Sequence, residues 1–237
     1  MPDTRSHRGP HPDDRRLFSE AEVPQLRAAT NDLCWLLDRA YATNSALKLV
    51  GDRYSLTSRQ RTAVSRCAAS RAMVEDRGTR LVAPPRLKDR IVWIDGYNVL
   101  TTVEAALGGG VILAAKDGCY RDMASMHGSY RKVAETLPAL ELIGNVVAGW
   151  NVAGCRWLLD SPVSNSGRLK RILCDVAAAH GWNWDVELVQ NPDAVLIESD
   201  EIVATADSLI LNKCRSWLNL ARHVVEHISS AWIVDLS

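Results

Sequence analysis

The chain has 237 residues and carries 28 basic and 28 acidic side chains, so its formal net charge is zero. This balance excludes a uniformly basic nucleic-acid coat and an acidic disordered chain, although it allows local charged patches. The longest charge-free apolar stretch, residues 142–155, is too short to span a membrane, so we expect no membrane association. The six cysteines are widely spaced, mostly in apolar runs, which predicts free thiols in a cytoplasmic protein.

The first 90 residues predict a tail, a helical module and a linker. Residues 1–16 are polar and predict a disordered tail. Residues 17–75 contain two capping boxes, the second at Thr57–Gln60, each followed by apolar residues at helical spacing. They predict a helical module whose first helix runs from about 20 to 43. Residues 76–90 contain Gly, two prolines and many charges, which predicts a linker.

From residue 91 onward, short apolar runs alternate with helical segments. The predicted strands are 91–94, 155–159, 186–189, 202–204 and 231–234, and the predicted helices are about 124–149, 166–180 and 207–228. Strands that alternate with helices are typical of an α/β domain with a mainly parallel sheet, and we assign this domain to residues 91–237.

Four of the predicted strands end at or near an aspartate: Asp95, Asp160, Asp207 and Asp235. In an open α/β sheet the ligand site lies outside the carboxyl ends of the strands. Clustered carboxylates repel each other, and a divalent cation with oxygen ligands, such as Mg²⁺ or Mn²⁺, relieves that repulsion. Any one of these residues could instead be a helix N-cap, but four together favour a metal site that acts on phosphodiesters.

Two segments resemble signatures of the PIN-like nuclease superfamily, in particular its NYN branch. They are Ile94–Leu100, which contains DGYN, and Thr205–Ile210, which contains TADS. The order of polar residues is also similar to that family: Asp95 with Asn98, Asp160, Asp207 with Ser208, then Asp235. The whole chain resembles a family of uncharacterised prokaryotic proteins that join a helical module to such a domain.

The resemblance implies a Rossmann-like, mainly parallel sheet and a metal-dependent endoribonuclease, with Mg²⁺ or Mn²⁺ as cofactor and RNA as substrate. Asp95 and Asp207 would hold the metal, with Asp160 beside it. Asn98 and Ser208 would orient ligands or phosphate.

PIN-like domains usually carry a further acidic residue on a helix after the first strand. The candidates here are Glu104, Asp117 and Asp122. The segment KDG predicts an ordered turn, which favours Asp117 as an additional metal ligand, while the other two stay open.

A Ser/Asn-rich loop, residues 161–170, follows a predicted strand and opens a helix. Its hydroxyls and backbone amides would lie at a helix N-terminus, where the helix dipole favours anions. We expect it to bind the RNA backbone or a terminal phosphate through Ser164, Asn165, Ser166, Gly167, Arg168 and Lys170. A capping loop over a surface helix is the alternative interpretation.

Charge is segregated although it sums to zero. Five arginines and no acids lie between Arg53 and Arg71, which suits phosphate contacts or a solvated helix face. We therefore expect the helical module to guide RNA or a protein partner. Two other functions stay open: a non-catalytic nucleic-acid-binding protein, and a metal-dependent phosphatase or phosphotransferase. A long basic groove would favour the nuclease, and a closed pocket the phosphatase.

Overall fold

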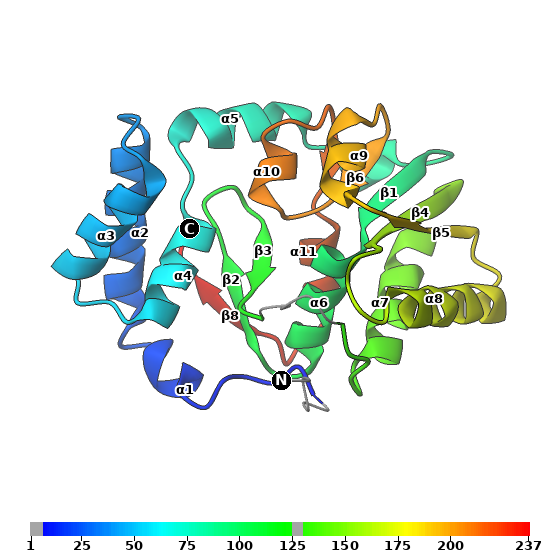
Figure 1. Ribbon diagram of the computed structural model, residues 1–237, viewed down its shortest axis with the longest axis horizontal. Helices are drawn as coiled ribbons and strands as arrows, with labels where there is room; N and C mark the ends of the chain where they lie inside the picture. The colour runs from blue at the N-terminus through cyan, green and yellow to red at the C-terminus, as the bar shows by residue number, and fades with distance from the viewer. Residues whose placement is uncertain (1–6, 125–129) are drawn as a thin grey trace.

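The computed structural model describes residues 7–124 and 130–237 (Figure 1). Short helices form a group on one side of the molecule, and a larger α/β part forms the other side. The helices of the N-terminal group are α1 (Asp14–Leu17), α2 (Val23–Leu37), α3 (Thr43–Arg53), α4 (Ser58–Cys67) and α5 (Arg71–Arg80). The Thr57–Gln60 capping box is present and begins α4. The single predicted helix 20–43 is instead α2 and the start of α3, separated by a turn in which Ala40 has a positive φ.

A five-stranded parallel sheet forms the centre of the α/β part. Its strands are β1 (Ile91–Asp95), β4 (Gly154–Asp160), β5 (Trp184–Val189), β6 (Ile202–Ala204) and β7 (Trp217–Leu218), in the spatial order β5-β4-β1-β6-β7. The chain runs outward from β1 through β4 to β5, then returns to the other side of β1 at β6. This reversal creates a switch point between β1 and β6, where ligands bind in doubly wound sheets. The predicted α/β class and mainly parallel sheet are confirmed.

Helices cover both faces of this sheet and include two that the sequence analysis did not predict, α6 and α9. They are α6 (Gly96–Leu107), α7 (Thr136–Ala148), α8 (Ser166–His180), α9 (Pro192–Glu198), α10 (Ser208–Leu211) and α11 (Leu220–Val225), with a 3₁₀ turn at Pro84–Arg86. The prediction of a helix over 166–180 is confirmed. The predicted helix 207–228 is wrong, because strand β7 interrupts it and pairs with β6. Part of the predicted helix 124–149 lies outside the described residues.

A second, three-stranded sheet lies between the helical group and the five-stranded sheet (Figure 1). Its order is β3 (Tyr120–Asp122), β2 (Val111–Ala114), β8 (Trp232–Asp235); β2 is antiparallel to β3 and parallel to β8. The predicted strand 231–234 therefore exists, but in another sheet. Asp235 is placed away from the other strand-end aspartates, where Arg27 of α2 pairs with its carboxylate at 3.1 Å.

The helical group shares a hydrophobic core with the three-stranded sheet. Side chains of α2 and α4 pack in one buried cluster with residues of β2 and β8, among them Leu26, Leu33, Val64, Leu113 and Val234. The apolar faces of helices and of a sheet must each be buried against another element. Here the helices α2 and α4 and the strands β2 and β8 bury each other. The two parts are thus one packed body.

The predicted tail and linker both contain ordered contacts. Residues 1–6 lie outside the described residues, but Arg8 is buried and its Nε donates to Glu104 Oε2 at 2.8 Å. Helix α5 extends to Arg80, inside the predicted linker 76–90. Polar composition predicts solvent exposure, and it fails here because these side chains have buried partners. None of the helices described is both long and apolar enough to cross a membrane.

Candidate active site

Four carboxylates converge at the carboxyl edge of the five-stranded sheet. Asp95 and Asp160 are the last residues of β1 and β4, and Asp207 follows β6 as the N-cap of α10. Because these strands are parallel, their carboxyl ends lie at one edge. The fourth, Asp193, lies in the first turn of α9, which packs against β1 and β4. The structure therefore places the three predicted aspartates at one edge of the sheet and adds a fourth at the same edge.

The sequence analysis missed Asp193, although a signal was present. Asn191 caps α9 by accepting a hydrogen bond from the Ala194 amide at 3.1 Å, and Pro192 occupies the first helical position. An Asn–Pro pair after a strand is a common helix start. It would have placed Asp193 at the same edge of the sheet.

Electrostatics mark these groups as a crowded anionic site. Burial raises the pKa of Asp95 to about 7, the hydrogen bond from Thr205 opposes this shift, and the charges of Asp207 and Asp193 add to it. Burial and Asp193 likewise raise the pKa of Asp160, and burial and Asp207 raise that of Asp193. Among the described residues, no Lys or Arg pairs with Asp95, and no donor hydrogen-bonds the carboxylates of Asp160 or Asp193. A cation would relieve this repulsion.

The DGYN and TADS segments hold each other in place. Thr205 Oγ1 donates to Asp95 Oδ2 at 2.8 Å and accepts from the Asp207 amide at 3.0 Å. Asn98 Oδ1 accepts from the Ala206 amide at 2.8 Å, so Asn98 positions the turn. Asp207 Oδ1 caps α10 by accepting from the amides of residues 209 and 210. The side chain of Ser208 is exposed at the start of this helix.

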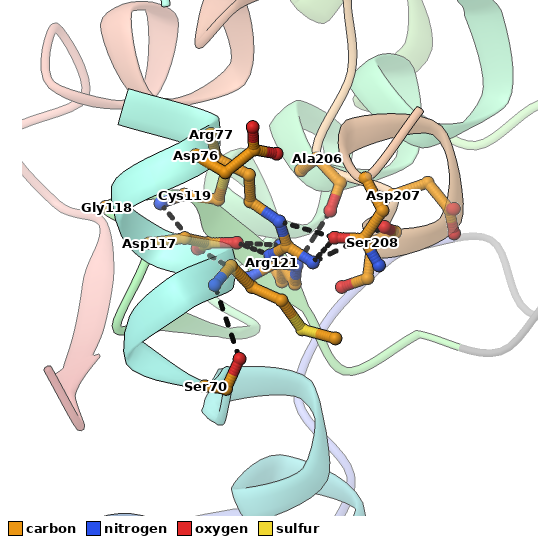
Figure 2. A network of polar contacts seen from close by, with 12 residues as sticks. Ser70, Asp76, Arg77, Asp117, Gly118, Cys119, Arg121, Ala206, Asp207 and Ser208 are labelled. Atoms are coloured by element: carbon orange, nitrogen blue, oxygen red, sulfur yellow. Dashed lines mark hydrogen bonds and ion pairs between the residues drawn. The ribbon is translucent and has the colours of Figure 1, made fainter. Parts of the chain in front are cut away.

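Asp117 lies in a buried network with two arginines, one of them from the helical group (Figure 2). Arg121 donates to both of its oxygens, at 2.9 and 2.7 Å, and Arg77 of α5 donates to Oδ2 as well. Burial would raise the pKa of Asp117, but Arg121 and Arg77 outweigh burial and lower it to about 2. Its oxygens already have cationic partners, so the interpretation of Asp117 as a metal ligand is wrong.

The same network supports the turn that carries Asp207. Arg121 Nε donates to the Ala206 carbonyl at 2.7 Å, and Arg77 Nη2 donates to the Ser208 carbonyl at 3.4 Å and to Asn212 Oδ1 at 2.6 Å. Figure 2 shows both guanidinium groups beside this turn. The helical group therefore contacts the candidate site through a side chain that is itself buried.

The other two candidates for the additional acidic residue have different environments. Glu104 is fully buried and accepts from Arg8, from the Tyr130 hydroxyl at 2.6 Å and from the Thr136 hydroxyl at 2.7 Å. Asp122 accepts from the Thr102 hydroxyl at 3.0 Å and lines the same cleft as Asp207. Of the three candidates, Asp122 is the one that shares a cavity with Asp207.

The Ser/Asn-rich loop contains one buried serine, Ser166, and several exposed residues. Ser166 is buried, and its hydroxyl bonds the Tyr97 hydroxyl at 2.7 Å and the Asp160 carbonyl at 2.5 Å. Asn165 has φ 71° and donates from Nδ2 to the Tyr130 carbonyl at 2.9 Å. Ser166 is buried and folds the loop, so its side chain is not open to phosphate. Asn165 is exposed and lines a pocket together with Arg168, so its contact with phosphate stays a prediction.

The other loop residues that were predicted to bind phosphate are at least partly exposed. Ser164, Gly167 and Arg168 are exposed, and Lys170 is partly exposed. Arg168 lines a pocket of about 220 Å³ together with Arg131 and Lys132. A basic pocket therefore lies at the start of α8, linked to the strand ends through the Ser166–Tyr97 contact.

The arginines between Arg53 and Arg71 do not form a free basic surface. Arg53 pairs with Asp32, Arg59 with Asp14, and Arg61 with Asp52. Arg66 donates to the Asp122 carbonyl and lines the cleft beside Asp207. Most of this charge is neutralised inside the helical group, and one arginine, Arg66, reaches the site.

A cleft of about 540 Å³ opens between the helical group and the α/β part. Its walls come from α2, α4 and α5 on one side and from α6, β3 and α10 on the other. Within residues 7–124 and 130–237, no three His, Cys, Asp or Glu side chains lie close enough together to hold a metal ion by themselves. Mg²⁺ usually binds one or two carboxylates plus substrate phosphates and waters, and the pair Asp95 and Asp207 fits that donor set.

Fold and site together define an α/β protein with a doubly wound parallel sheet and an acidic switch point. The family model "Domain of unknown function (DUF5616)" matches residues 84–223, more than half of the chain, so the chain belongs to that family. The model "Protein of unknown function (DUF434)" matches residues 25–80, which span α2 to α5. Together they confirm the expected membership of an uncharacterised family.

An archaeal relative shares both regions. The chain is 28% identical over 206 residues to "Uncharacterized protein MJ0935" of Methanocaldococcus jannaschii. The aligned residues make up 87% of this chain and 96% of the relative. No solved structure matches the chain.

Proposed function

We propose that this protein is a metal-dependent ribonuclease that hydrolyses RNA phosphodiester bonds in the cytoplasm. The observation that carries the proposal is the placement of four aspartates, Asp95, Asp160, Asp193 and Asp207, at the switch point. The pKa values of Asp95, Asp160 and Asp193 are raised, and no Lys or Arg among the described residues pairs with Asp95. Ionisable side chains whose pKa values are shifted by burial and by like charges are typical of functional sites. All six cysteines are free, which fits a reducing compartment.

In this proposal Asp95 and Asp207 hold Mg²⁺ or Mn²⁺. When bound, the ion neutralises the scissile phosphate and lowers the pKa of a water molecule. Thr205 orients the Asp95 carboxylate through its 2.8 Å hydrogen bond, and the α10 cap leaves Oδ2 of Asp207 free. Asp160 and Asp193, with their raised pKa values, are suited to accept a proton from the attacking water.

RNA would extend from this edge toward the basic pocket. Arg168, with Arg131 and Lys132, lines that pocket, and Lys170 lies two residues further along α8. Exposed Ser164 and Gly167 leave room for a phosphate at the helix N-terminus. We expect Arg168→Ala combined with Lys170→Ala to weaken RNA binding and to flatten its dependence on salt, because fewer counterions are released.

The test is cleavage of a single-stranded RNA oligonucleotide in Mg²⁺ or Mn²⁺. Asp207→Asn keeps an oxygen that can cap α10 but removes the charge, so we expect cleavage to fall at least about 100-fold with the fold intact. The matched control is Asp185→Asn at the opposite end of the sheet, whose side chain is 72% exposed. Equal rates for wild type and Asp207→Asn would contradict the proposal.

A phosphatase or phosphotransferase is the second candidate, because the cleft of about 540 Å³ falls in the size range of small-molecule sites. Hydrolysis of p-nitrophenyl phosphate, with intact RNA in the parallel assay, would favour it. RNA binding without cleavage in either metal would favour the non-catalytic binding protein. The observation behind this alternative is that no three carboxylates among the described residues lie close enough together to hold a metal ion.

A further inference from the structure

The cleft beside Asp207 has one apolar wall and one polar wall. The apolar wall comes from the helical group and consists of Leu33, Leu37, Ala68, Ala69 and Met73. Met73 is 41% exposed, so a ligand in the cleft can reach its side chain. The family models match this wall and the opposite wall separately, so the cleft lies where the two matched regions meet.

The polar wall belongs to α6, β3 and the turn before α10. Asn98 lines this wall and uses its oxygen to accept from the Ala206 amide, and its NH₂ group has no acceptor among the described residues. Thr101, Thr102 and Asp122 form the neighbouring surface, and Asp207 lies at its end. Arg66 adds a positive charge from the helical group, with its side chain 35% exposed.

We infer that this cleft binds one unstacked nucleoside of single-stranded RNA, with the base against the apolar wall and its phosphate toward Asp207. The inference rests on the proposed function for the phosphate end of the site. An unpaired base needs an apolar surface for its ring face and polar groups for its edge, and the two walls supply one each.

Other small ligands fit this lining less well. A sugar phosphate has no ring face to cover Leu37, Ala68 and Met73. A fatty acid or another lipid would bring its apolar chain against Asp122 and Asp207. A nucleoside also makes use of both family regions, which would explain why the helical group is packed so close to the acidic edge.

Binding of nucleoside monophosphates tests the inference directly. Isothermal titration calorimetry with AMP, CMP, GMP and UMP, in Ca²⁺ to hold the phosphate, is compared with ribose 5-phosphate, which lacks a base. We expect at least one nucleotide to bind tenfold or more tightly than ribose 5-phosphate. Equal affinities would overturn the inference.

Substitutions on the apolar wall locate the site. Met73→Asn should weaken nucleotide binding about fivefold or more, and Ala68→Trp, which fills the cleft from a partly exposed position, should abolish it. The matched control is Leu49→Asn on α3, because Leu49 is 59% exposed and does not line the cleft. Unchanged nucleotide affinity in both cleft variants would overturn the inference.

RNA cleavage separates this inference from the proposed function. If RNA is cleaved, Met73→Asn should raise KM more than it lowers kcat. If wild type cleaves no RNA but binds nucleotides in a base-dependent way that Met73→Asn weakens, the nuclease proposal fails and the cleft assignment stands. If RNA is cleaved and neither cleft variant changes KM, the cleft assignment fails and the nuclease proposal stands.

Discussion

Two groups of carboxylates in this protein have opposite surroundings. Asp117 and Glu104 are buried with arginines that reach them from the helical group and the N-terminal segment. Asp95 lies among other carboxylates and lacks a basic partner within the described chain. A buried acid with its own arginine connects parts of the structure, whereas a buried acid next to other acids destabilises the native state until a ligand arrives.

The largest effect should come from removing a paired carboxylate. Asp117→Ala leaves Arg77 and Arg121 buried without their counter-charge, and we expect the free energy of unfolding to fall by about 3 kcal/mol. Urea denaturation at pH 7 measures this change. Asp185→Ala, at an exposed carboxylate, should change stability by less than about 0.5 kcal/mol. A loss below about 1 kcal/mol for Asp117→Ala would mean that the pair contributes little.

Acid should reveal the same pair in wild type. The pKa of Asp117 is about 2 in the folded protein and 3.8 for an unperturbed aspartate. Because the folded value is the lower one, the stabilisation is complete above about pH 4 and is lost as the pH falls through 2. Between pH 5 and pH 2, the free energy of unfolding of Asp117→Asn should therefore fall by about 2 kcal/mol less than that of the wild type. Urea denaturation of both proteins between pH 5 and pH 2 tests this, and parallel curves would contradict it.

A divalent cation should have a smaller, stabilising effect at the unpaired group. If Mn²⁺ binds only the native state, a concentration tenfold above its Kd raises stability by about 1.4 kcal/mol. Asp207→Asn should reduce the accompanying rise in Tm, whereas Asp185→Asn should leave it unchanged. Melting curves in increasing Mn²⁺ measure the effect. Identical curves for wild type with and without millimolar Mn²⁺ would contradict a metal site.

The smallest effect should have the opposite sign from that of Asp117→Ala. Asp95→Asn removes a crowded charge and keeps an oxygen for the Thr205 hydroxyl, so the metal-free protein should gain about 1 kcal/mol at pH 8. The expected gain is modest because Asp95 keeps part of its surface in water. Urea denaturation in EDTA measures it. A loss of stability would contradict this prediction and would mean that Asp95, like Asp117 and Glu104, stabilises the fold.

Local patterns predicted the five-stranded sheet well but not the contacts around it. Four of its strands are short apolar runs. Asp95 and Asp160 end two of them and Asp207 follows a third, so all three lie at one edge because the strands are parallel. By contrast, the partners of Asp117 come from Arg77 in sequence-distant α5 and from Arg121 in an unpredicted strand. No local pattern distinguishes an aspartate that will meet two arginines from one that will not.

The three-stranded sheet was missed for a related reason. Its strands β2 and β3 are short, and β2 pairs with β8 across more than a hundred residues of chain. Asp193 does not end a strand: it lies in the first turn of α9, whose start at Asn191–Pro192 is a few residues beyond β5. The pairing of β2 with β8 depends on residues far apart in sequence, whereas the signal for Asp193 was local.

The position of β8 has a consequence for the order of synthesis. Helices α2 and α4 emerge from the ribosome early, yet part of the apolar surface that covers them belongs to β8, which follows every other element. Until β8 has been synthesised and has paired with β2, the nascent helical group exposes part of its apolar surface. Exposed apolar surface of this kind is what chaperones bind. A chain that stops before residue 231 would carry that face permanently.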